Sequence, residues 1–591
     1  MVRSIANIRQ YLLHLTTINV ASLSTEQATS LKAENNICIF EFLEKEDFLD
    51  NEFVVNALIK NYHIPCINAM TENVTALHYE KINEYFKEGY FIFKNTEGIE
   101  SYAVNNLSVI KEKKLDTKND IQIYLVTHQD LLKILEREFS QSNTHWAINH
   151  LGSISPNASA KNINYTQMIT GSAVIFFSTL ILFFNVFSMI NNFAYLLQNF
   201  LKAILFKRSL AGVEKSTIAS INDDMPIYSV LIPLYKEELK VQSILQAIKN
   251  LNYPKDRLDV KFIIEADDLL TMKAIKVLSL PSYIHIIKVP YSLPRTKPKA
   301  LNYAMAYVRG EFLTIYDAED RPDPDQLLKA LHAFNTLPEH FACIQAKLNF
   351  YNAQENLLTR FFSIEYSVWF EYLLKGLSLL DLPVTLGGTS NHFKVDKLKE
   401  VGYWDAYNVT EDADLGIRLY LNGYKVHLID STTMEEAPTN METWIAQRAR
   451  WIKGFIQTLY IFMRAKKDRS KFSTLKVLTV YIFVGLSTYS FFCLPWLLLV
   501  LMLNNSYPIY YMWLVNSIFS FSYMYAIAYF VLIKDKTTLR HLSPMEWITL
   551  LCWPLYFILH TIASYRAIWE TLVSPFKWNK TPHGKSINDL D

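Results

Sequence analysis

The sequence predicts an α/β domain with a doubly wound parallel sheet, inserted between transmembrane helices and preceded by a small α+β domain. In residues 210–470, short apolar runs typical of strands alternate with runs typical of helices. Long uncharged stretches lie on both sides of this region, and residues 1–160 mix helix and strand patterns. Strands that alternate with helices indicate parallel pairing, with helices packed on both faces of the sheet.

Four apolar runs are predicted to form the strands of that sheet. They cover residues 230–235, 261–266, 285–290 and 312–317, and the helical patterns KVQSILQAIKNL, MKAIKVLSL and KALNYAMAYVRG lie between them. In sheets of this kind, ligands bind beyond the carboxyl ends of the strands. We therefore expect the functional site at that edge.

The composition indicates a membrane protein. Half of the 591 residues are hydrophobic and 19% are charged, whereas soluble domains carry about 25% charged residues. The net charge of +1 provides no general attraction for nucleic acid. The five cysteines are scattered, so neither a zinc site nor a disulfide scaffold is expected.

The first uncharged stretch is long enough for two membrane spans. The 40 residues from Asn162 to Leu201 carry no charge, and as a helix they would reach about 60 Å, twice the hydrocarbon thickness of about 30 Å. We expect a transmembrane hairpin over residues 162–208, with spans near 168–188 and 190–206. The basic residues at its end favour a cytoplasmic exit.

Residues 475–570 predict a second membrane region. Its uncharged part, from Val477 to Ile533, holds two spans, and a third apolar segment covers residues 547–565. The basic tail 571–591 favours the cytoplasm, which requires an even number of crossings. We therefore expect residues 547–565 to be re-entrant or interfacial, and the alternative is an extra crossing inside the uncharged part.

Acidic residues follow three of the four predicted strands. Glu237 follows the first strand, Asp267 and Asp268 follow the second, and the loop Asp317-Ala-Glu319-Asp320 follows the fourth. Gathered at one edge of a sheet, these carboxylates suit a hard divalent cation that bridges the phosphates of a nucleotide. Without a cation they would repel one another and raise their pKa values.

The order of the motifs resembles a known family. VLIPLYKE, EADD, PRTKPKALNYAM, YDAED, TED and QRARW follow one another within residues 226–460. This order is similar to that of the membrane-embedded processive family-two glycosyltransferases, the group of cellulose, chitin and hyaluronan synthases. The resemblance implies a GT-A-like nucleotide-sugar-binding domain over residues 210–470. It also implies a multi-pass protein of the inner membrane, with this domain in the cytoplasm.

The resemblance implies roles for the residues that bind the donor. Glu237 and one of Asp267 and Asp268 would contact the base of the nucleotide, and Lys299 would lie near its phosphates. Asp317 and Glu319 occupy the DxD positions, which bind Mg²⁺ or Mn²⁺ and the diphosphate. The family has aspartate where this chain has Glu319, so either Glu319 or Asp320 completes the ligand set.

Two further motifs imply the catalytic and acceptor residues. In TED, Asp412 would act as the general base that takes the proton of the acceptor hydroxyl. The alternative for this motif is a plain helix start with Thr410 as N-cap. In QRARW, Gln447, Arg450 and Trp451 would contact the diphosphate and the acceptor, and the alternative is an interfacial helix. LGGTSNHF, residues 386–393, lies where relatives line the acceptor.

The N-terminal region is less informative. NALIKNYHIPCINA, residues 56–69, is loosely similar to the N-terminal domain of type II secretion ATPases, which precedes some glycosyltransferases of this group. The arginine-bearing motif of nucleotide-binding relatives is not evident. We therefore expect residues 1–160, which include the helical pattern LKILEREF at 132–139, to serve docking or structure rather than nucleotide sensing.

Together these features predict an enzyme that transfers a sugar, with inversion, from a nucleotide-diphosphate donor to a growing polysaccharide. The resemblance favours a UDP-sugar donor and leaves room for membrane lipids and export proteins as partners. Two alternatives stay open: a non-processive transferase that acts on a lipid carrier, and a catalytically silent membrane receptor or export subunit. The motifs encode neither the sugar nor the linkage.

Overall fold

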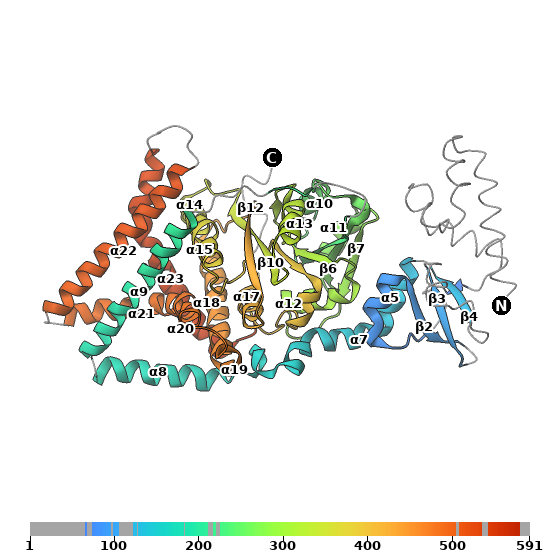
Figure 1. Cartoon of the computed structure of the whole chain (residues 1–591), viewed down its shortest axis with the longest axis horizontal. Helices are drawn as coiled ribbons and strands as arrows, with labels where there is room; N and C mark the ends of the chain where they lie inside the picture. The colour runs from blue at the N-terminus through green and yellow to red at the C-terminus, as the bar shows by residue number, and fades with distance from the viewer. Residues whose placement is uncertain are drawn as a thin grey trace. The chain divides into compact units, whose positions relative to one another are not determined.

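The chain forms two compact units, residues 1–146 with 305–309, and residues 147–304 with 310–591. Figure 1 shows the course of the chain. The structure, a computed structural model, describes residues 66–67, 74–95, 98–105, 122–126, 128–182, 184–210, 217–219, 225–503, 507–534 and 542–578.

The first unit contains a small mixed sheet with the strand order β1-β4-β3-β2. Its strands are β1 (Cys66–Ile67), β2 (Tyr90–Lys94), β3 (Glu100–Val104) and β4 (Gln122–Val126). β2 and β3 pair antiparallel, and β4 is parallel to both β3 and β1. Helix α5 (Ile82–Glu88) follows the short helix η1 (Tyr79–Lys81) and ends at Gly89, whose φ of 73° suits glycine. Of the predicted similarity at residues 56–69, only Cys66 and Ile67 lie among the described residues.

The second unit is built on an eight-stranded sheet with the order β7-β6-β5-β8-β11-β10-β12-β9. Its strands are β5 (Tyr228–Leu234), β6 (Leu258–Glu265), β7 (Ile284–Val289), β8 (Phe312–Ile315), β9 (Arg321–Pro322), β10 (Phe341–Phe350), β11 (Asn391–Lys394) and β12 (Lys425–Glu435).

The four predicted strands correspond to β5–β8, which are all parallel to their neighbours. The α/β, GT-A-like fold class is confirmed, but the expectation of a purely parallel sheet is wrong. β11 pairs antiparallel with both β8 and β10, while β10 and β12 are parallel. The mixed half begins at β11, which starts within the acceptor-like segment 386–393 and pairs antiparallel with β8.

The domain built on this sheet also contains several helices, most of which contact its strands. They are α10 (Val241–Lys249), α11 (Leu269–Lys276), α12 (Lys297–Ala304), α13 (Gln326–Thr336), α14 (Leu357–Tyr366), α15 (Lys375–Leu379), α16 (Val395–Glu400), α17 (Glu411–Leu421), α18 (Met441–Arg464) and α19 (Lys466–Arg469); a π-helical run, η7 (Ser367–Leu374), joins α14 to α15.

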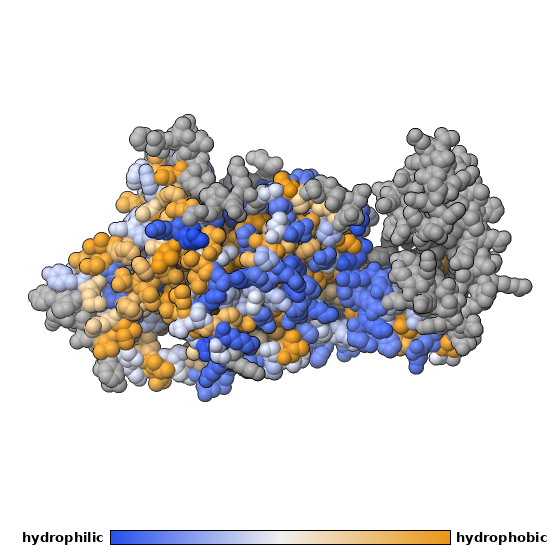
Figure 2. All heavy atoms as spheres, viewed as in Figure 1, coloured by the Kyte–Doolittle hydropathy of each residue, from blue (hydrophilic) through white to orange (hydrophobic). Residues whose placement is uncertain are grey.

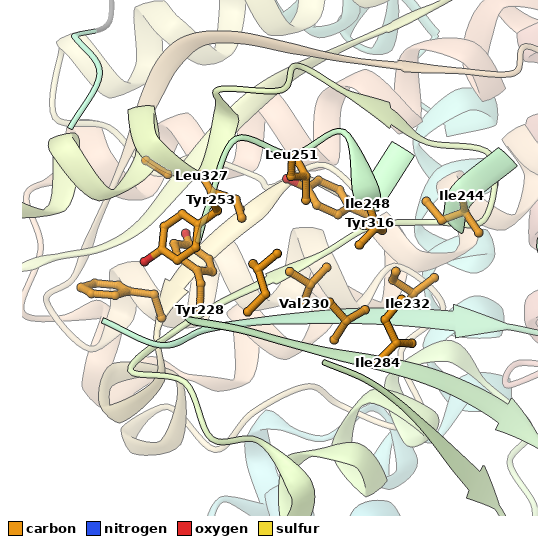
Figure 3. Close-up of a cluster of buried hydrophobic side chains, with 14 of the residues drawn as sticks. Tyr228, Val230, Ile232, Ile244, Ile248, Leu251, Tyr253, Ile284, Tyr316 and Leu327 are labelled. Carbon is orange, nitrogen blue, oxygen red and sulfur yellow. The ribbon is translucent and has the colours of Figure 1, made fainter. Parts of the chain in front are cut away.

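A hydrophobic core fixes the parallel half of the sheet. All eight residues of β6 are buried, as expected for a strand covered on both faces. Ile244 and Ile248 of α10, one helical turn apart, pack against Val230 and Ile232 of β5 (Figure 3). This packing holds the carboxyl ends of the strands, and the loops that follow them, in place.

Apolar helices lie before and after the sheet domain. α7 (His128–Ile154) leads through 3₁₀ turns to α8 (Tyr165–Leu182) and α9 (Phe184–Leu210). After the domain come α20 (Thr474–Val480), the π-helical η8 (Tyr481–Leu486), α21 (Ser487–Leu503), α22 (Tyr507–Lys534) and α23 (Pro544–Val573). Hydrophobic side chains gather over α9, α21 and α22 (Figure 2).

Three of the described helices are long and apolar enough to cross a membrane: Thr474–Trp496, Tyr510–Ile533 and Pro544–Val573. The first two match the two helices expected in the uncharged part of the C-terminal region. The residues of the predicted hairpin form two helices, α8 and α9. Neither helix is among the three candidate membrane spans, so the transmembrane hairpin stays a prediction. A re-entrant loop at 547–565 is wrong, because this segment belongs to one continuous helix.

Candidate functional site

A cavity of about 840 Å³ lies at the carboxyl ends of the parallel strands. Its lining includes six segments of the chain. They are the loops after β5 and β8, the segment that leads into α12, the first turn of α17, the first half of α18, and the segment after α23. Seven of the predicted site residues line it, together with Lys297: Glu237, Asp317, Glu319, Asp412, Gln447, Arg450 and Trp451.

Of the three acidic residues in the loop after β8, two line the cavity and one is buried beside it. Asp317 and Glu319 line the cavity. Asp320 is buried and accepts hydrogen bonds from the Asp317 backbone N–H, at 2.8 Å, and from the Thr389 hydroxyl. Asp320 therefore holds the loop in shape, and this favours Glu319 over Asp320 as the partner of Asp317.

The carboxylates at this loop repel one another. Burial, together with the charges of Asp320 and Glu319, raises the pKa of Glu435 on β12 well above its usual range. The pKa of Asp320 is also raised well above its usual range, by burial and then by the charges of Asp317 and Glu319. A bound cation would relieve this repulsion.

Asp317 and Glu319 alone offer too few oxygen atoms for a divalent cation, and they fit one only if a bound diphosphate supplies further oxygens. Among the described residues, no group of three or more His, Cys, Asp or Glu side chains is placed to hold a metal ion. Asp317 Oδ1 lies 2.5 Å from Lys297 Nζ. A hard cation needs about six oxygens, so Asp317 and Glu319 would have to share it with diphosphate oxygens and water.

Of the two lysines in PRTKPK, Lys297 is the one that lines the cavity, and it is not among the predicted site residues. Its ammonium pairs with Asp317 and donates to the Gly388 carbonyl at 2.7 Å. Burial lowers the pKa of Lys297, but the charges of Asp317 and Glu411 outweigh burial and raise it above its usual value.

The predicted Lys299 lies elsewhere. It is fully buried and pairs with Glu265 at 2.8 Å, and it does not line the cavity. The motif PRTKPK contains two lysines two positions apart, which point to different sides of a helix. Only the structure shows which of them faces the cavity.

Of the acidic residues predicted after β5 and β6, only Glu237 lines the cavity. Glu237 lines the cavity, and its backbone N–H donates to the Thr271 hydroxyl at 3.0 Å. Asp268 caps helix α11 and accepts from the Lys236 backbone N–H at 2.5 Å, so its carboxylate shapes the loop.

Asp267 lies next to the cavity rather than on its wall. Its carboxylate is 2.6 Å from the guanidinium of Arg295, which does line the cavity. Arg295 also donates to the Tyr235 hydroxyl at 2.6 Å. Asp267 is therefore placed to act through Arg295, a residue that the sequence pattern did not single out.

The TED motif begins helix α17. Thr410 is the N-cap residue, but its side chain makes no capping hydrogen bond. Asp412 lines the cavity, and its Oδ1 accepts from the Ala413 backbone N–H at 2.7 Å. Burial raises the pKa values of both Asp412 and Glu411, while the charge of Lys297 opposes this shift.

Segment 386–393, which resembles the acceptor-lining segment of relatives, passes close to the Asp412 carboxylate. A Cβ at Gly388 would lie 3.3 Å from Asp412 Oδ2, so a side chain at this position would narrow the approach to the carboxylate. Gly388 and Thr389 both line the cavity.

Helix α18 presents the QRARW motif along one side of the cavity. Gln447, Arg450 and Trp451 all line it. Arg450 donates weakly to the Val409 carbonyl, at 3.4 Å, next to the TED motif. The Trp451 ring lies against Phe362 and Tyr366, with ring centroids 5.9 and 6.1 Å apart.

Residues 574–578, directly after α23, complete the lining, and sequence reasoning missed them. Lys453 of α18 donates to the carbonyls of Ser574 and Lys577, at 3.3 and 2.9 Å. The guanidinium carbon of Arg450 lies 5.5 Å from the Trp578 ring. The sequence signal for this contact is a pair of aromatic residues, Phe576 and Trp578, in the basic tail. The positive charge of that tail indicates its side of the membrane and does not predict a contact with the cavity.

Known glycosyltransferases are similar to this chain in sequence and in structure. Residues 312–533 match the family model described as "Glycosyl transferase family group 2". The probable glycosyltransferase YdaM of Bacillus subtilis (strain 168) is 29% identical over 254 residues, which are 42% of this chain and 60% of that protein. Glucomannan 4-beta-mannosyltransferase 1 of Oryza sativa subsp. japonica is 28% identical over 287 residues, 46% of this chain and 54% of that protein. The chain thus spans little more than half the length of these curated relatives.

Among solved structures, a mannosyltransferase from Pyrobaculum calidifontis in complex with GDP-Man and Mn²⁺ is similar, with a TM-score of 0.45 and 18% identity. The similarity covers 65% of this chain and 98% of that one. The S. aureus protein TarS, residues 1–349, in complex with UDP has a TM-score of 0.32 and 12% identity, over 61% of this chain and 98% of that one. Residues 312–533 are thus similar to the family group 2 glycosyltransferases, and the named relatives are glycosyltransferases as well.

Proposed function

We propose that the protein is an inverting membrane glycosyltransferase that moves a sugar from a nucleotide-diphosphate donor to a growing polysaccharide. One observation carries the proposal: acidic, basic and aromatic side chains from six separate segments meet in one cavity. Asp317, Glu319, Lys297, Arg450, Asp412 and Trp451 all belong to its lining, and Lys297 pairs with Asp317. This set can hold a diphosphate, a sugar ring and a hydroxyl nucleophile together.

In the proposed reaction, Asp412 takes the proton of the acceptor hydroxyl as its oxygen attacks C1 of the donor sugar. The bond between C1 and the diphosphate oxygen breaks, and its electron pair leaves with the diphosphate. Lys297 and Arg450 can stabilise that leaving group with charged hydrogen bonds. Attack opposite the leaving group inverts the configuration at C1.

Asp317 and Glu319 would hold Mg²⁺ or Mn²⁺ together with the diphosphate. A bound cation supplies charge neutralisation for the leaving group. Glu237, and Asp267 through Arg295, would contact the base end of the nucleotide. Trp451 offers a flat apolar face for a sugar of the acceptor.

The donor and acceptor are proposed by class. The resemblance to polysaccharide synthases favours a UDP-sugar, whereas two curated relatives are named as glucomannan mannosyltransferases, which makes a mannosyl donor a second candidate. The test is to incubate purified membranes with labelled UDP- and GDP-hexoses and Mn²⁺, and then to size the product. A polymer from one donor supports the proposal, and the absence of transfer or hydrolysis with every donor would contradict it.

Asp412→Asn should lower kcat by at least about 100-fold, because an amide cannot accept the hydroxyl proton. Donor affinity should stay within about twofold. Since burial raises the pKa of Asp412 and the base must be unprotonated, kcat/KM of the unmodified enzyme should fall with decreasing pH at a higher pH than an ordinary aspartate would cause. Rate measurements across pH check both points, and near-normal transfer by Asp412→Asn would exclude this role.

Asp317→Ala should abolish the dependence of donor binding on Mn²⁺, because it removes the carboxylate at the strand end that faces the diphosphate. Glu319→Asp should be tolerated better than Glu319→Ala, since a carboxylate is retained. Calorimetric titration with UDP and GDP, with and without Mn²⁺, measures the effect. Metal-dependent binding of normal strength in Asp317→Ala would exclude this donor set.

The two lysines of PRTKPK should behave differently. Lys297→Met should weaken nucleoside diphosphate binding by about 10- to 100-fold, as expected for the loss of a charged hydrogen bond. Lys299→Met should lower the melting temperature through the unpaired Glu265 and leave affinity almost unchanged. Binding and thermal unfolding of both variants test this assignment, and a reversed pattern would restore Lys299 as the phosphate contact.

We further propose that the catalytic domain is cytoplasmic and that only two C-terminal helices cross the inner membrane. The chain enters this region beside Asp381, which pairs with Lys476, and leaves it at Ser574, which Lys453 of α18 contacts. The second half of α23 lies along α18, where Ala563 and Ala567 pack on Ala449 and Ile452. The two ends of this C-terminal region therefore lie on the same side of the membrane, which requires an even number of crossings. This favours α21 and α22 as the spans and α23 as an interfacial helix.

Single cysteines test this topology, in a background that lacks the five native ones. Ser543→Cys and Val573→Cys lie at the two ends of α23, and both residues are exposed. An impermeant maleimide should label neither in intact cells and both in inverted vesicles. Labelling of only one of them from outside would mean that α23 crosses the membrane.

A further inference from the structure

A charged cluster lies behind Trp451, outside the cavity. It is centred on Arg448 of α18 and Glu365 of α14, which form an ion pair. Neither residue lines the cavity, but Arg448 is the residue of QRARW that faces away from Gln447 and Arg450 toward a group of aromatic rings. The proposed reaction does not use this pair.

Three aromatic rings enclose the guanidinium of Arg448. Its central carbon lies 4.4 Å from the Trp451 ring, 4.6 Å from the Phe362 ring and 5.2 Å from the Trp444 ring. A planar guanidinium attracts the faces of such rings, and a lysine ammonium does not reproduce this stacking. One cation therefore contacts the indole that forms part of the cavity wall.

Glu365 determines where that guanidinium lies. Its carboxylate pairs with Arg448 and accepts a hydrogen bond from the Tyr556 hydroxyl at 2.6 Å. His560 Nε2 lies 3.4 Å from the other carboxylate oxygen. The Trp444 indole N–H in turn donates to the Tyr556 hydroxyl at 3.2 Å.

Tyr556 and His560 both belong to α23. The cluster therefore joins three helices: α14 from the sheet domain, α18 with the QRARW motif, and α23 from the membrane region. Its end nearest the cavity is the Trp451 ring.

We propose that Glu365 and Arg448 are positioning residues for Trp451, which hold its indole in the orientation at which an acceptor sugar stacks on it. The inference rests on the proposed function, because it requires Trp451 as the acceptor surface. Tyr556 of α23 completes the arrangement, so the packing of this helix also sets the acceptor site.

The test variant is Arg448→Lys, which keeps the charge beside Glu365 and loses the planar stacking. We expect KM for cellotetraose or β-1,4-mannotetraose as acceptor probe to rise about tenfold, the scale of one cation–π contact. KM for the donor and the rate of donor hydrolysis by water should stay unchanged. Equal loss of transfer and hydrolysis would indicate a merely structural role and overturn the proposal.

Arg469→Lys is the matched control. Arg469 on α19 also stacks on two rings, 5.5 Å from Phe462 and 5.8 Å from Tyr481, and donates to the Tyr481 hydroxyl, but it lies outside the cavity lining. Its substitution should change neither acceptor KM nor donor hydrolysis. A rise in acceptor KM equal to that of Arg448→Lys would overturn the proposal.

A double-mutant cycle shows whether Arg448 acts through Trp451. In a Trp451→Ala background, Arg448→Lys should have no further effect on acceptor KM. Independent, multiplying effects of the two substitutions would overturn the proposal. Glu365→Gln should reproduce the acceptor effect, and it replaces Arg448→Lys in the cycle if that variant does not fold.

Direct binding separates this inference from the proposed function. Saturation-transfer NMR with the same tetrasaccharides reports acceptor binding without turnover. If no nucleotide sugar is used but probe binding falls in Arg448→Lys and not in Arg469→Lys, the positioning role stands and the proposed reaction fails. Unchanged probe binding in Arg448→Lys would refute the positioning role whatever the activity.

Discussion

The site depends on the ion pair between Lys297 and Asp317. The Lys297 ammonium lies 2.5 Å from Asp317 Oδ1 and 2.7 Å from the Gly388 carbonyl, so it joins the loop after β8 to the segment that precedes β11. Its charge also counteracts the rise in pKa that burial imposes on Glu411 and Asp412. One buried cation thus connects the proposed donor loop, acceptor segment and catalytic base.

This arrangement constrains what the cavity can bind. Asp317, Glu319, Glu411, Asp412 and Glu435 place several carboxylates on its lining, against the lysines and arginines that share it. A diphosphate adds further negative charge, which the proposed divalent cation would balance. Lys297 would then be able to exchange Asp317 for a phosphate oxygen. Outside the lining, the ion pair of Glu365 and Arg448 lies against the Trp451 ring, and Tyr556 donates a hydrogen bond to Glu365.

Periodicity predicted the parallel half of the fold because β5–β8 are short apolar runs separated by amphipathic helices. It missed the mixed half, since β12 mixes buried and partly buried residues over 11 positions and carries four charged or histidine side chains. Asp317, Asp412 and Arg450, which motif order singled out, all line the cavity. It selected Lys299, whereas Lys297 lines the cavity, because the direction of a helical side chain depends on packing that the motif does not encode. Residues 574–578 reach the cavity only through tertiary contacts with α18, and no local pattern encodes such contacts.

The most direct test of the central claim is an experimental structure of the Asp412→Asn variant with the intact donor and Mn²⁺, because this variant should bind the donor without consuming it. The account predicts that the diphosphate contacts Lys297 and Arg450, with the sugar between residue 412 and Trp451 and the base near Glu237 and Arg295. A sugar bound at the Tyr235 end of the cavity, away from residue 412, would contradict the account.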